Sequence, residues 1–84
     1  MKTGVIVYVV GNGRTENAVD MEKAVERLRI DADMVEIASH EACSVHDAWR
    51  FLRVKGMHLI ECMMAELTGS GELRLTGQRL RLCG

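Results

Sequence analysis

The 84-residue chain contains no proline, only three aromatic residues and only three cysteines. It has no C-x-x-C motif, and without proline no cis-proline can lie beside a thiol, which argues against a thioredoxin-like redox enzyme. An odd number of cysteines at this low density excludes a disulfide scaffold and indicates free thiols in a reducing compartment. No apolar run approaches the roughly 20 residues that cross a bilayer, and the first residues do not resemble a signal peptide. We therefore expect a cytoplasmic protein without a membrane segment.

A strong charge of either sign is also missing, since the formal net charge is -1. Residues 1–41 hold five basic and eight acidic side chains (-3), whereas residues 42–84 hold six basic and four acidic ones (+2). This mild asymmetry permits contact with nucleic acid but does not argue for it. The 48% hydrophobic and 27% charged content predicts a single folded domain over residues 1–84. Such a small domain has a thin core, so burial through self-association is favourable.

The first half of the chain has the pattern of a β-α-β unit. Gly4–Val10, GVIVYVV, is a continuous run of β-branched and aromatic residues, typical of a strand covered on both faces. The next apolar residues recur at helical spacing and predict an amphipathic helix: Ala18, Met21, Val25 and Leu28. Met34–Ala38 then supplies a second strand, and a right-handed crossover makes the two strands parallel.

A second helix is predicted between Ser44 and Gly56. Ser44 with Asp47 three residues later resembles a capping box, and Gly56 suits the left-handed position that follows a helix. One face of this helix is apolar and is formed by Val45, Ala48, Trp49 and Leu52.

The remaining residues allow two interpretations. Met57–Leu67 has helix-forming residues, but its position after a capped helix favours a third strand over residues 57–63. The segment ELRLTGQRLRL alternates leucine with arginine on both sides of Thr76-Gly77, which predicts an antiparallel hairpin. The expected fold is thus a small α/β domain with an open mixed sheet, in the order β-α-β-α-β followed by this hairpin. If residues 57–67 were helical, the chain would be an α+β domain.

A glycine-rich segment, Gly11, Asn12, Gly13, Arg14 and Thr15, lies between the first strand and the first helix. Free backbone N–H groups before a helix form anion sites, so these residues are candidates for binding an anion or a nucleotide. However, Glu16 replaces the third glycine of a G-x-G-x-x-G motif, and the G-K-[ST] ending of a P-loop is missing. The interpretation as a plain turn is therefore favoured.

Histidine and cysteine gather after the second strand, where His40, Cys43 and His46 have H-x2-C-x2-H spacing. Imidazole and thiolate are ligands that zinc prefers, so these residues are candidate metal ligands, with Cys62 or water as a fourth. Both candidate segments follow parallel strands and are expected at the carboxyl edge of the sheet, the usual ligand side of such sheets. The alternatives are an activated Cys43 nucleophile and, more simply, solvated histidines beside a buried cysteine.

The C-terminal segment offers a third candidate, because Arg74, Arg79 and Arg81 would share one face of the predicted hairpin. Such a basic ribbon could contact nucleic-acid phosphates. Three arginines on a strand pair are more often a solvated face that prevents edge-to-edge aggregation.

No catalytic, nucleotide or metal pattern in the chain is complete, which argues against an enzyme. We expect a non-catalytic binding or assembly module that forms a homo-oligomer or binds a protein partner. The alternatives are a small-ligand or zinc site at the carboxyl edge and nucleic-acid contact through the C-terminal arginines.

Overall fold

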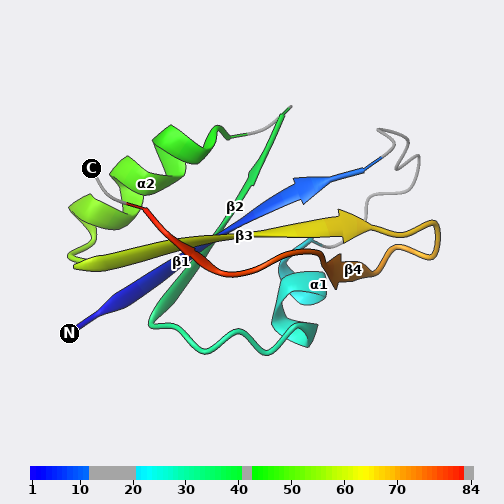
Figure 1. Ribbon diagram of the computed structural model, residues 1–84, viewed down its shortest axis with the longest axis horizontal. Helices are drawn as coiled ribbons and strands as arrows, with labels where there is room; N and C mark the ends of the chain where they lie inside the picture. The colour runs from blue at the N-terminus through cyan, green and yellow to red at the C-terminus, as the bar shows by residue number, and fades with distance from the viewer. Residues whose placement is uncertain (12–20, 41–42, 83–84) are drawn as a thin grey trace.

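The computed structural model describes residues 1–11, 21–40 and 43–82. Its elements are, in chain order, β1 (Thr3–Val10), α1 (Met21–Arg27), β2 (Met34–Ser39), α2 (Val45–Val54), β3 (Leu59–Leu67), β4 (Leu73–Leu75) and β5 (Leu80–Arg81) (Figure 1). The described residues thus form a small open mixed sheet with two helices, and the predicted α/β class is confirmed. The described part of the chain contains no helix long and apolar enough to cross a membrane.

β1 is the centre of the sheet, whose strand order is β2-β1-β3-β4. It pairs in parallel with β2 and with β3, so that Val5 lies beside both Val35 and Glu61. Val5, Ile6 and Val7 have no exposed surface. The uninterrupted apolar run of β1 is therefore explained by burial on both faces, as in a parallel sheet.

Each helix covers one side of the sheet, and we name the sides after them. On the α1 side, Ala24 and Val25 pack against odd-numbered residues of β1, with Met63 and Ala65 of β3. On the α2 side, Ala48 and Leu52 pack against Ile6 and Ala38, with Ile60 of β3. Figure 1 shows α2 above the strands toward the left of the molecule and α1 below them near its middle. Within the described part of the chain, these two helices leave parts of both sides of the sheet uncovered.

The ends of α2 agree with the sequence prediction. The Ser44 hydroxyl oxygen accepts a hydrogen bond from the Asp47 N–H at 3.1 Å, which satisfies a free donor of the first turn. At the other end Gly56 has a φ of +91°. Its N–H bonds the Arg53 carbonyl and the Met57 N–H bonds the Leu52 carbonyl, each at 3.0 Å. This pattern is a Schellman motif, which requires a left-handed residue and so favours glycine.

Met57–Leu67 resolves as a strand over most of its length, so the helical alternative and the α+β class are wrong. β3 pairs with β1 from Leu59, beside Thr3, to Glu66, beside Val10. The strand begins two residues later and ends four residues later than the predicted 57–63. Pairing with buried β1 outweighs the helical propensity of its Met, Glu and Ala residues.

The predicted C-terminal hairpin is incorrect in its pairing. β4 and β5 do not pair with each other, because both pair antiparallel with β3. The tight turn lies instead between β3 and β4, where Thr68 N–H bonds the Glu72 carbonyl at 2.8 Å and Gly71 has a φ of +82°. The alternation of leucine and arginine fits strands that pair with each other and strands that both pair with β3. The sequence pattern therefore could not distinguish the two arrangements.

Candidate functional site

The two segments predicted at the carboxyl edge do begin side by side. Gly11 follows β1 and His40 follows β2, and the last paired residues of these strands are Val9 and Ser39. Asn12, Gly13, Arg14 and Thr15 lie outside the described residues. A Cβ atom on Gly11 would approach the Leu67 Cβ to 3.2 Å. Close approach to the end of β3 therefore accounts for this glycine without a ligand.

The three predicted zinc ligands have separate surroundings. Cys43 is half-buried against the α2-side core, and its thiol donates a 3.5 Å hydrogen bond to the Ser44 carbonyl. His46 is exposed and stacks on Trp49, with ring centroids 6.4 Å apart. Among the described residues, which include His40, no three His, Cys, Asp or Glu side chains are grouped so that they could hold a metal ion. Zinc binding at this edge therefore stays a prediction that the geometry does not support.

The predicted basic face of the C-terminal segment does not form. Arg74 lies opposite Glu66 on the α2 side of the sheet, whereas Arg81 lies opposite Glu61 on the α1 side. Two of the three guanidinium groups also bind carboxylates, Arg74 to Glu66 at 3.0 Å and Arg79 to Glu61 at 2.8 Å. These ion pairs reduce the positive potential that phosphate groups would meet.

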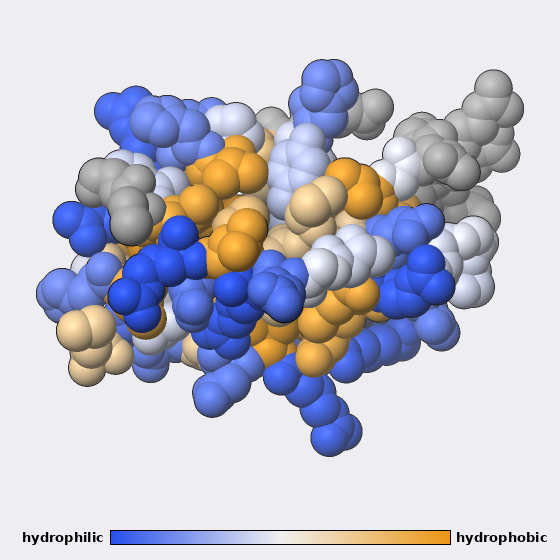
Figure 2. Space-filling model, in the orientation of Figure 1, coloured by the Kyte–Doolittle hydropathy of each residue, from blue (hydrophilic) through white to orange (hydrophobic). Residues whose placement is uncertain are grey.

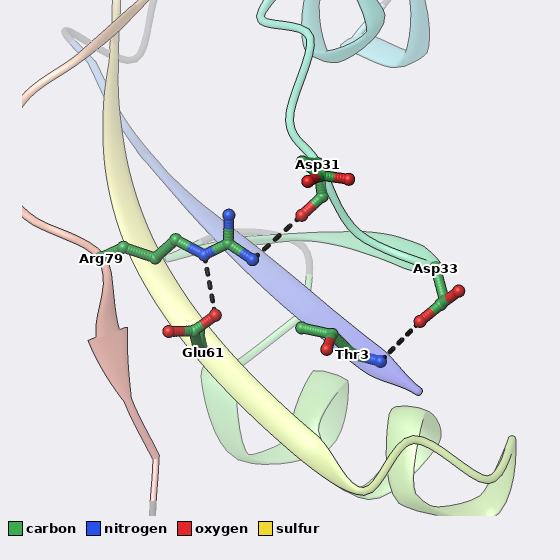
Figure 3. Close-up of polar contacts among 5 residues, drawn as sticks. All are labelled: Thr3, Asp31, Asp33, Glu61 and Arg79. Atoms are coloured by element: carbon green, nitrogen blue, oxygen red, sulfur yellow. Dashed lines mark hydrogen bonds and ion pairs between the residues drawn. The ribbon is translucent and has the colours of Figure 1, made fainter. Parts of the chain in front are cut away.

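A polar cluster at the amino ends of the strands was not predicted (Figure 3). Arg79 reaches from the C-terminal edge to donate hydrogen bonds to the Glu61 carboxylate and, at 3.0 Å, to the Asp31 carbonyl. Beside it, the Asp33 carboxylate accepts a 2.7 Å hydrogen bond from the Thr3 N–H. The cluster surrounds a polar pocket of about 310 Å³. The Asp33–Thr3 hydrogen bond joins the segment before β2 to β1, and Arg79 joins the same segment to Glu61 of β3. The observed role of the cluster is therefore structural.

An apolar groove lies between α1 and β2, and it was also missed by sequence reasoning. Val25, Ile30, Val35 and Ile37 line it, and the exposed residues Glu22, Glu26 and Arg29 contribute its charged groups. Its volume is about 440 Å³. Because Val35 and Ile37 belong to the outermost strand, the groove borders the edge of the sheet. Among the described residues, α1 covers only part of the α1 side of β2, and Val35 and Ile37 stay partly exposed.

The α2 side also keeps apolar surface in contact with solvent. Met64, which lies beside Tyr8, is 45% exposed, and Leu80, which lies beside Cys62, is 63% exposed. In the orientation of Figure 1, apolar side chains reach the surface across the middle of the molecule and hydrophilic ones surround them (Figure 2). These side chains could bury further apolar area against a partner.

Two titratable side chains have pKa values displaced by burial. Desolvation raises the pKa of the Cys62 thiol, which keeps it protonated and weakly nucleophilic at neutral pH. Desolvation also raises the pKa of the Glu36 carboxyl group, on the α2 side of β2. Neither residue lines the polar pocket or the apolar groove described above.

Comparison of the chain with models of protein families, with curated proteins and with solved structures finds no match in any of the three.

Proposed function

We propose that this chain is a non-catalytic assembly module that binds a second copy of itself. The observation that carries the proposal is the apolar surface left uncovered on both sides of the sheet. It comprises Met64 and Leu80 on the α2 side and the groove lined by Val35 and Ile37 on the α1 side. A domain of this size gains a larger fraction of buried surface from association than a large domain does.

The alternative functions receive less support. Arg74 and Arg79 are engaged by carboxylates on their own sheet, which weakens the case for nucleic-acid binding. The histidine and cysteine side chains are not grouped as metal ligands among the described residues. Exposed apolar groups instead favour a protein surface as the ligand, because their burial is the main driving force of most protein association.

Sedimentation velocity of the unmodified chain under reducing conditions tests this function. We expect a reversible monomer–dimer equilibrium between about 1 μM and 1 mM, which corresponds to roughly -8 to -4 kcal/mol of binding free energy. A chain that stays monomeric over this range would contradict the proposal. A substrate-dependent turnover that is lost on Cys43→Ala would contradict its non-catalytic part.

A further inference from the structure

We propose that the second copy binds at the edge of β2, so that the two β2 strands pair antiparallel about a two-fold axis perpendicular to the sheet. This inference rests on the proposed function and specifies the surface and the partner. The two sheets would then form one continuous sheet with both α1 helices on the same side. The argument uses the direction of the main-chain groups, the register they allow and the charges around the groove.

The main-chain groups of Val35 and Ile37 point away from the sheet. Along a strand, the N–H and C=O groups of alternate residues point to opposite sides. Leu59 N–H bonds the Lys2 carbonyl, so even-numbered residues of β1 point toward β3 and odd-numbered ones toward β2. With the observed register, even-numbered residues of β2 then point toward β1 and odd-numbered ones point outward. Ser39 agrees with this, since its N–H bonds the Cys43 carbonyl outside the sheet.

These groups are unpaired by any strand among the described residues, because β2 has only β1 as a neighbour. An extended strand beside β2 would satisfy them by ordinary sheet pairing. The sequence of β2, MVEIAS, includes no proline, glycine or lysine that would prevent such pairing.

A register centred on Ile37 suits two identical strands. Ile37 would exchange both main-chain hydrogen bonds with the partner's Ile37. Val35 would lie opposite the partner's Ser39, whose N–H is bonded to the Cys43 carbonyl of its own chain at 2.9 Å, so that carbonyl must leave Ser39 before Val35 can pair there. In this register Glu36 faces the partner's Ala38 on the α2 side. A register centred on Glu36 would instead place two carboxylates directly opposite each other, which is unfavourable.

The charges around the groove are complementary in the same arrangement. In a β-α-β unit α1 runs opposite to β2, so Glu22 lies toward the carboxyl end of β2 and Arg29 toward its amino end. A two-fold axis reverses these directions in the partner. The acidic end of each groove therefore faces the partner's Arg29, and the apolar floors formed by Val35 and Ile37 meet at the axis.

A matched pair of substitutions tests the proposed edge. Ile37→Lys places a charge beside the axis, whereas Leu75→Lys places the same charge on the α1 side of the opposite edge strand. We expect Ile37→Lys to weaken dimerisation at least about tenfold and Leu75→Lys to change it less than about threefold. Equal effects of the two substitutions, in a dimer that still forms, would overturn the inference but leave the proposed function standing. A monomeric unmodified chain would overturn both.

Cysteine cross-linking provides a second test that does not depend on introducing a charge. In a chain with Cys43→Ser, Cys62→Ala and Cys83→Ser, Ile37→Cys would place two thiols across a pair of Cα atoms about 5.5 Å apart. The matched variant Val35→Cys would lie four residues from its own copy, about 13 Å along the strand. Mild oxidation should cross-link the first dimer and not the second. Cross-linking of the Val35→Cys chain alone, or of neither chain when the dimer is present, would overturn the proposed pairing.

Discussion

The two edges of the sheet differ in continuity and in charge. β2 is an uninterrupted strand of six residues with Glu36 as its one charged side chain. The opposite edge is divided into β4 and β5, because the partners of β3 residues 65 and 62 are residues 75 and 80. Between these paired positions β3 has two residues and the edge has four, which leaves two extra residues on the edge, where Gly77 has a positive φ of +103°. Interruption and charge are features that prevent strand pairing, so of the two edges formed by the described residues the β2 edge suits the proposed pairing better.

The largest expected effect is the loss of stability caused by a proline in β2, which tests the direction in which the main-chain groups of β2 point. In Ala38→Pro the lost N–H is one that points toward β1, and the ring would crowd a fully buried site on the α2 side. We expect a loss of at least about 3 kcal/mol in the free energy of unfolding. Urea denaturation monitored by circular dichroism would measure it.

Ile37→Pro is the matched control, because its N–H points away from the sheet. This variant should lose clearly less stability than Ala38→Pro and should no longer dimerise, since proline removes a donor at the pairing edge. The opposite ranking of the two prolines would mean that the outward groups of β2 have been assigned incorrectly.

A smaller effect is expected from the ion pairs of the opposite edge. The Arg79 and Glu61 side chains are 30% and 20% exposed, whereas Arg74 and Glu66 are 70% and 49% exposed. Arg79→Met should reduce the free energy of unfolding by about 1–2 kcal/mol, because it removes a charged hydrogen bond that is partly shielded from water. Arg74→Met should change it by less than about 1 kcal/mol. Similar losses in urea denaturation would show that the Arg79 cluster does not hold this edge.

The interruption at Gly77 can be tested by adding a single methyl group. A Cβ atom would meet nothing within 4 Å at Gly77 or at Gly69, but only Gly77 of the two has a positive φ. Gly77→Ala should therefore lower the free energy of unfolding by about 1 kcal/mol through backbone strain alone. Gly69→Ala should leave it nearly unchanged. If thermal or urea unfolding gave equal values for the two variants, the interruption would not depend on this backbone conformation.

The smallest effect concerns Glu36 and its dependence on pH. Burial raises the pKa of its carboxyl group in the folded protein, so ionisation is easier in the unfolded chain. The folded state therefore loses stability as pH rises from the ordinary glutamate value to the raised one. Glu36→Gln should be slightly more stable than the unmodified chain at pH 7, and this advantage should vanish below about pH 4. The exposed Glu72→Gln is the control, and a pH-independent difference for Glu36→Gln would contradict the desolvation argument.

The sequence predicted those elements whose position depends on neighbouring residues alone. The uniform apolar run predicted β1, and Ser44, Asp47 and Gly56 predicted the ends of α2 because caps depend on neighbouring residues. The pairing of β4 and β5 with β3 could not be predicted, since it depends on the length of a distant strand. The same applies to the Arg79 cluster, which joins residues 48 positions apart.

The candidate surface was less predictable than the fold. Self-association was expected from the small size of the chain, but nothing in MVEIAS distinguishes an edge strand from a central one. The edge position of β2 follows from β3 taking the other side of β1, which is a property of the whole sheet. The uncovered groove likewise follows from where α1 lies, and the apolar spacing alone could not give that position.

Amide hydrogen exchange measured by NMR at several protein concentrations tests the central claim most directly. We expect the N–H groups of Val35 and Ile37 to be protected at about 1 mM and to lose protection on dilution, because only the partner accepts their hydrogen bonds. The N–H groups of Glu36 and Ala38, which point toward β1, should stay protected at every concentration. If Val35 and Ile37 exchanged freely in a solution that sedimentation shows to be dimeric, the β2 edge would not be the interface.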